Sequence, residues 1–176
     1  MGFQSAVSLA QGFGVPGEQF TDGPTRAETF TINSASADYN IIGATACSVT
    51  SQGFCAAGNT SGVLPFAGIL VDPKDVALFG TGGVPLAPTL TVPNFTIVEC
   101  ATMGSFVVTL PGAAAIGDSV IFDNTTGALS TITPETPLPS GTTYANAQVA
   151  YYTQGISGSA LAVISVQQTF IIPQPI

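Results

Sequence analysis

Hydrophobic and polar residues alternate with a period of two along much of the chain, and turn residues separate these stretches. The pattern is typical of β-strands, whereas helical periodicity is scarce. FAGILV is almost wholly apolar and predicts a buried strand, with Gly68 where a neighbour approaches closely. The predicted strands are Phe30–Ile32, Cys47–Ser51, Phe66–Val71, Thr89–Val92, Phe95–Met103, Ser105–Leu110, Asp118–Asp123, Ala128–Ile132, Asn146–Thr153 and Ala160–Val166.

Turn residues indicate how some of these strands are joined. The stretch DNTTG between Ile121-Phe122 and Ala128 predicts a hairpin, because Asn and Asp tolerate left-handed geometry and Gly127 supplies a positive φ. One short helical connector is predicted in VDPKDVALFG, residues 71–80. We therefore expect an all-β fold, an antiparallel barrel or jelly-roll-like sandwich with an extended N-terminal arm and little helix.

The two ends of the chain lack the alternating pattern of strands. We expect residues 1–29 to form the extended arm, residues 30–166 the β-domain, and residues 167–176 a C-terminal tail. The tail contains TFIIPQPI, whose two prolines do not suit a ladder strand. With 176 residues and no obvious linker, a single folded domain is the natural expectation.

The arm contains GFGVPGE, which formally fits the dinucleotide-binding fingerprint G-x-G-x-x-G through Gly12, Gly14 and Gly17. That fingerprint needs a buried strand before it and a helix directly after it. FQSAVSLAQ is too polar for such a strand, and the sequence Asp22-Gly23-Pro24 predicts a turn. The glycines are therefore interpreted as part of an arm whose backbone lies close to a neighbour.

Charged residues make up only 7% of the chain, compared with about 25% in ordinary globular proteins. A lightly charged surface is a poor colloidal stabiliser, so we expect burial against a partner or in a homo-oligomer, with a dimer favoured over a trimer. Lys74 and Arg26 are the only basic residues, against ten carboxylates. This balance argues against nucleic acid and anionic membranes as partners. No basic n-region or long apolar segment suggests secretion or membrane insertion.

The chain contains no His, which removes Ser-His-Asp and Cys-His nucleophile systems and His-based zinc sites. Cys47, Cys55 and Cys100 lack zinc-finger spacing and are interpreted mainly as small buried hydrophobes, with a Cys47–Cys55 bridge as the alternative. Carboxylate pairs such as Asp118/Asp123 could in principle serve a glycosidase, and Asp72, Asp75 or Asp22 could bind calcium, but both signals are weak. We expect no enzyme activity, no cofactor, no metal and no bound nucleotide.

The aromatic residues of the arm are candidate contact residues. Phe3, Phe13 and Phe20 lie outside any strand pattern, so they either fix the arm to its own domain or anchor it to a neighbouring subunit. The guanidinium of Arg26 can bind a carboxylate within the fold or across an interface. The predicted partner-contact residues are Phe3, Gly12, Phe13, Gly14, Val15, Gly17, Phe20 and Arg26.

Three stretches in order, GFGVPGEQFTDGPTRAETFTINS, FAGILVDPK and CATMGSFVVTLPGAAAIGDSVIFDNTTGALST, resemble the structural cement proteins of tailed bacteriophages. YANAQVAYYT and ALAVISV resemble the C-terminal half of that family, whereas TFIIPQPI departs from it. The resemblance implies an all-β capsid decoration protein that is made in the host cytoplasm. It implies binding outside the phage head, where the protein bridges and stabilises major capsid subunits, and no catalytic residues.

Two other functions fit the sequence less well. A β-sandwich could bind a glycan or a protein on a phage tail or cell surface. A carboxylate glycosidase is the third hypothesis, although such sites normally stack sugars on aromatic rings and the chain has no Trp.

Overall fold

The computed structural model describes residues 14–20, 23–59, 64–71, 90–112, 114–156 and 159–167. Its regular elements are β1 (Arg26–Thr31), the 3-10 helix η1 (Ala37–Tyr39), β2 (Ala46–Val49), β3 (Cys55–Ala57), β4 (Phe66–Val71), β5 (Ile97–Leu110), β6 (Ser119–Asp123), β7 (Leu129–Ile132), β8 (Thr142–Ile156) and β9 (Ser159–Val166). The predicted all-β antiparallel fold is confirmed. No helix in the described part of the chain could cross a membrane.

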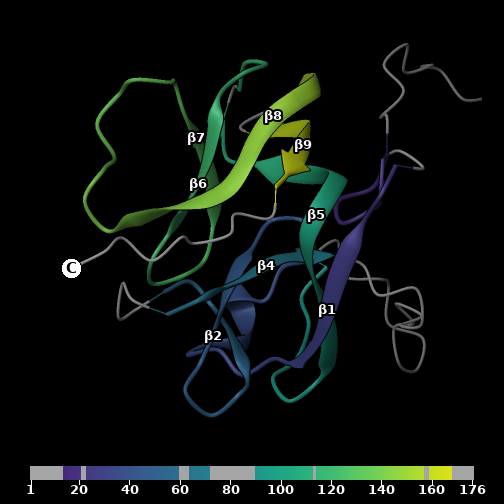
Figure 1. Ribbon diagram of the computed structural model, residues 1–176, viewed down its shortest axis with the longest axis vertical. Coiled ribbons are helices and arrows are strands. Elements are labelled where there is room, and N and C mark those ends of the chain that lie inside the picture. Colours follow the sequence, from purple (N-terminus) through teal and green to yellow (C-terminus); the bar gives the residue numbers. More distant parts are fainter. Residues whose placement is uncertain are drawn as a thin grey trace, which may run out of the picture.

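The strands form one antiparallel sheet in the order β3-β2-β4-β5-β9-β8-β6-β7, and β1 pairs with β5 as well. Strands β6 to β9 gather at one end of the molecule and β1, β2 and β4 at the other, with β5 reaching into both (Figure 1). The first half of β5 pairs with β1 and β4, and its second half, from Gly104, pairs with β9. The fold is thus organised around β5.

The sheet curls until its two ends are linked. The N–H of Ala46 donates to the carbonyl of Gly127 at 2.8 Å, and the N–H of Leu129 donates to the carbonyl of Ala44 at 3.0 Å. An antiparallel bridge joins Thr45 to Ala128 between these bonds. These contacts join the start of β7 to the start of β2, so the curled sheet encloses a core.

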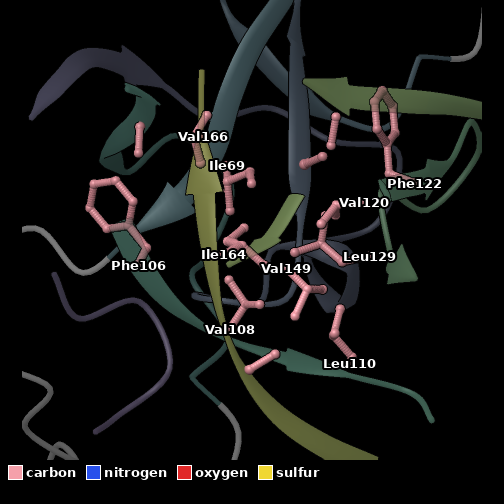
Figure 2. Close-up of a cluster of buried hydrophobic side chains, with 14 of the residues drawn as sticks. Ile69, Phe106, Val108, Leu110, Val120, Phe122, Leu129, Val149, Ile164 and Val166 are labelled. Atoms are coloured by element: carbon pink, nitrogen blue, oxygen red, sulfur yellow. The ribbon is translucent and has the colours of Figure 1, made fainter. Parts of the chain in front are cut away.

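Two buried clusters lie in the sheet. The larger one takes side chains from β2 and from β4 to β9, and Figure 2 shows Ile69, Val108, Val149 and Ile164 meeting within it. The second contains Leu70, Val98 and the three cysteines, and is completed by Ile32, Ile42, Ala67 and Val92. Because Ile69 faces the first cluster and its neighbour Leu70 faces the second, β4 is buried on both faces. This explains its uninterrupted apolar sequence.

Several observed strands differ from the predicted ones: β8 is longer at both ends than the predicted Asn146–Thr153, and three further differences concern β1, β5 and β3. Residues 26–29, expected in the arm, form the start of β1. The strands predicted at Phe95–Met103 and Ser105–Leu110 are one strand, because Gly104 bends it at a φ of 127° without ending it. Strand β3 was not predicted, since it is only three residues long and lies in a polar stretch.

The remaining predictions were confirmed, were confirmed in part, or concern residues outside the described part of the chain. Strand β4 has the predicted bounds, and β6 and β7 form the predicted hairpin. In the predicted strand Thr89–Val92, Thr91 makes a single bridge to Ile41. The helical connector expected around residues 72–80, and the tail beyond residue 167, lie outside the described residues.

Candidate functional site

The described part of the predicted arm lies along β5 of the same chain. The N–H of Gly17 donates to the carbonyl of Val107 at 2.8 Å, and the N–H of Val107 donates back to the carbonyl of Glu18 at 2.9 Å. The N–H of Phe20 donates to the carbonyl of Ser105 at 2.8 Å. Residues 17–20 therefore extend the sheet on the edge of β5 that faces away from β9.

Gly14 and Gly17 of this segment lie very close to other residues of the same chain. A Cβ on Gly14 would lie 2.7 Å from Cγ2 of Val107, and a Cβ on Gly43 would overlap the backbone of Gly17. The carboxylate of Glu18 accepts the N–H of Val15 at 3.0 Å, so an acidic group already occupies this turn. The turn is consequently unsuited to a phosphate, in agreement with the interpretation of the sequence.

The other predicted contact residues differ in their contacts and in how far they are exposed. The ring of Phe20 lies 5.9 Å from that of Tyr151, and Arg26 forms a 2.9 Å ion pair with Glu28 on the surface. Val15 is 57% exposed. Phe3, Gly12 and Phe13 lie outside the described residues. Within the described part, Val15 is thus the predicted contact residue that presents a large apolar side chain to solvent.

A second apolar feature, which the sequence did not predict, lies at the start of β5. Phe95 is 69% exposed and Ile97 is 64% exposed. These two exposed apolar residues lie two positions apart in the chain, at the start of β5, and are together called here the Phe95 surface. Phe95 has a φ of 65°, which is unusual for a bulky residue and costs roughly 1–3 kcal/mol.

A partly buried amide network holds this strained turn. Oδ1 of Asn94 accepts the N–H of Ser34 at 3.1 Å, while its Nδ2 donates to the carbonyl of Ser34 at 2.9 Å. Nδ2 of Asn40, a fully buried residue, donates to the same Oδ1 at 2.9 Å. The N–H of Phe95 itself donates to the carbonyl of Ile32 at 2.7 Å. The aromatic ring is therefore presented by a rigid support, which lowers the entropic cost of using it in binding.

The three cysteines, distant in sequence, converge in the second core. Cys47 lies on β2, Cys55 on β3 and Cys100 on β5, and all three are free and fully buried. Their Sγ atoms lie within 4.8 Å of one another. The burial expected from the sequence is confirmed, whereas the convergence was missed because it depends on strand order. The Cys47–Cys55 disulfide is absent.

The carboxylates considered for a glycosidase hold turns. Asp118 accepts the N–H of Ala115 at 2.9 Å. Asp123 accepts the N–H groups of Thr125 and Thr126 in the β6–β7 hairpin at 2.9 and 2.7 Å. Hydrogen bonds from the backbone and hydroxyl of Thr126 lower the pKa of Asp123, which keeps this carboxyl ionised. A general acid needs the opposite shift, so this arrangement does not favour a glycosidase.

Comparisons with known proteins agree with this fold. The sequence matches the family described as structural cement protein (E217 gp24/Pam3 gp6) over residues 3–167. A chain of the structure described as "The capsid of Myoviridae Phage XM1" has a similar fold, with a TM-score of 0.58 and 17% identity, over 96% of this chain and 99% of that chain. No curated protein gives a significant match.

The class defined by these findings is a structural protein of the phage capsid. The chain belongs to the structural cement family, as its residues had indicated, and its place is in the virion on the capsid.

Proposed function

We propose that the protein binds the outer surface of a phage head, where it bridges neighbouring major capsid subunits and stabilises the shell without catalysing a reaction. The family match over residues 3–167 is the observation that carries this proposal. The composition supports it, because a chain with 7% charged residues is suited to burial against another protein. The net charge of −8 is unsuited to contact with the packaged DNA.

The Phe95 surface is the contact region that the geometry favours most. Aromatic residues presented on a fixed backbone are frequent hot spots of protein interfaces, because little entropy is lost when they are buried. Phe95 combines high exposure with a backbone conformation that costs stability, and the Asn94 network maintains it. An exposed aromatic ring on a backbone conformation that costs stability does not stabilise the fold, so this combination favours a role in binding.

The N-terminal arm is the second proposed contact region. Phe3, Gly12 and Phe13 remain predicted contacts, and Val15 offers an exposed side chain at the point where the described segment turns toward β5. Gly14, Gly17 and Phe20 would act by fixing this segment, since their described contacts are with β5 and β8, whereas Arg26 remains a predicted contact and pairs with Glu28 on β1. We retain the homo-oligomer, with a dimer favoured over a trimer, as part of the proposal.

Co-sedimentation tests the function directly. Heads of the phage that encodes this chain, prepared without the cement protein, are incubated with the purified chain and pelleted, and the bound protein is quantified. We expect saturable binding and a higher temperature of head disruption. Failure to bind expanded heads would contradict the proposal, and selective binding to glycans would favour the surface-binding module instead.

A further inference from the structure

We propose that Cys47, Cys55 and Cys100 form a three-coordinate site for a single soft monovalent metal ion, Cu(I), that links β2, β3 and β5. The three sulfur atoms come from three strands and lie within 4.8 Å of one another. They are the only cysteines of the chain. The inference is independent of capsid binding.

The distances fit a trigonal complex. A metal–sulfur bond of about 2.3 Å, the usual length for a thiolate on zinc, places three sulfur atoms about 4.0 Å apart in a planar arrangement. The observed upper limit of 4.8 Å leaves less than about 1 Å of closure, within reach of side-chain rotation. The residue that pairs with Cys47 on β4 is Gly68, so no side chain stands opposite Cys47 on that strand.

The surroundings select the metal. Structural zinc is almost always four-coordinate, and the group formed by the described residues supplies three ligands. The cluster around the thiols contains Ile32, Ile42, Leu70, Val92 and Val98, all buried and apolar. Cu(I) is soft and accepts thiolate ligands.

The ion would act as a structural cross-link. Strand β3 has three residues and lies at an end of the sheet order, bonded to β2 alone among the named strands. An ion held by Cys55 on β3 and Cys100 on β5 ties this edge to the central strand. Because it binds the folded state, it raises the unfolding temperature, and it does so further as the free ion concentration rises above the dissociation constant.

The test uses the full-length, reduced protein under anaerobic conditions. Cu(I) is added in the presence of a competing chelator, and retained copper is measured after gel filtration. X-ray absorption reports the ligands. We expect one copper per chain, three sulfur neighbours and a raised unfolding temperature. C47S, C55S and C100S should each lower the affinity by more than the roughly 10–100-fold typical of losing an outer-shell partner.

Met103→Leu is the matched control, because it removes another sulfur of β5 and should leave copper retention unchanged. X-ray absorption of the wild type keeps the proposal testable if a serine variant fails to fold. Absence of retained copper, copper with nitrogen or oxygen neighbours, undiminished retention by C100S, or preferential retention of zinc would each overturn the assignment.

Discussion

The side-chain amide of Asn94 binds both backbone groups of Ser34, accepting its N–H at 3.1 Å and donating to its carbonyl at 2.9 Å. Ser34 is buried, so neither backbone group would find water easily if the amide were removed. This pairing fixes the residue directly before Phe95 and connects the protein core to the proposed contact surface.

Replacing Asn94 by Ala should lower the free energy of unfolding by about 2–3 kcal/mol, because buried donors and acceptors lose their partners. Asn94→Asp places a carboxylate oxygen in the position of Nδ2, 2.9 Å from the carbonyl oxygen of Ser34, so its loss should be at least as large. Urea unfolding measures both values. Equal stability of N94A and the wild type would show that the network does not support the turn.

Phe95→Gly should leave the free energy of unfolding unchanged or raise it by up to about 1 kcal/mol, because glycine adopts a φ of 65° without steric cost. Phe95→Ala removes the same ring but keeps the strain, so it should be less stable than F95G. Both variants should bind heads more weakly than the wild type. A large loss of stability in F95G would instead assign the ring to the protein's own packing.

Gly127→Ala should lower the free energy of unfolding by at least about 3 kcal/mol. A Cβ there would lie 2.5 Å from the carbonyl oxygen of Ala46 and 2.6 Å from the nitrogen of Gly58, at a φ of 73°. Gly141 has a similar φ of 80° with nothing within 4 Å, so Gly141→Ala should cost only about 1 kcal/mol. Thermal unfolding of the two variants separates the cost of the close contacts at Gly127 from the cost of a positive φ. Equal losses of stability would show that the close contacts at Gly127 contribute nothing.

The pH dependence of stability should include a contribution from Asp123. Hydrogen bonds from Thr126 and Thr125 lower its pKa below the ordinary value of 3.8. Its stabilising contribution is therefore present above pH 3.8 and is lost as the pH falls through the folded-state value. Unfolding measured from pH 5 downward should show the wild type losing stability relative to Asp123→Asn, and parallel profiles would argue against this role.

Local signals in the sequence predicted much of the fold. The apolar run of β4 and the turn residues of the β6–β7 hairpin were sufficient, because both depend on neighbouring residues. Two strands were predicted, one on either side of Gly104, although a strand that changes partners can bend at a glycine and continue. Strand β3 was missed since its three residues gain strand character only by pairing with β2.

The candidate sites were harder to predict. The convergence of Cys47, Cys55 and Cys100 requires the order of strands β3-β2-β4-β5, which no spacing in the sequence reveals. Phe95 had been included in a predicted strand, and only the fold shows that its ring is exposed. The sequence signal that could have indicated a turn was Pro93-Asn94, directly before it.

The most direct measurement compares Ile97→Ala with Ile116→Ala in binding to phage heads that lack the cement protein. Both isoleucines are 64% exposed, but Ile97 starts β5 beside Phe95, whereas Ile116 lies beyond the other end of β5. We predict saturable binding by the wild type, at least about 10-fold weaker binding by I97A, a loss of about 1.4 kcal/mol, and nearly unchanged binding by I116A. No binding by the wild type, or equal losses in the two variants, would contradict attachment to the capsid through the Phe95 surface.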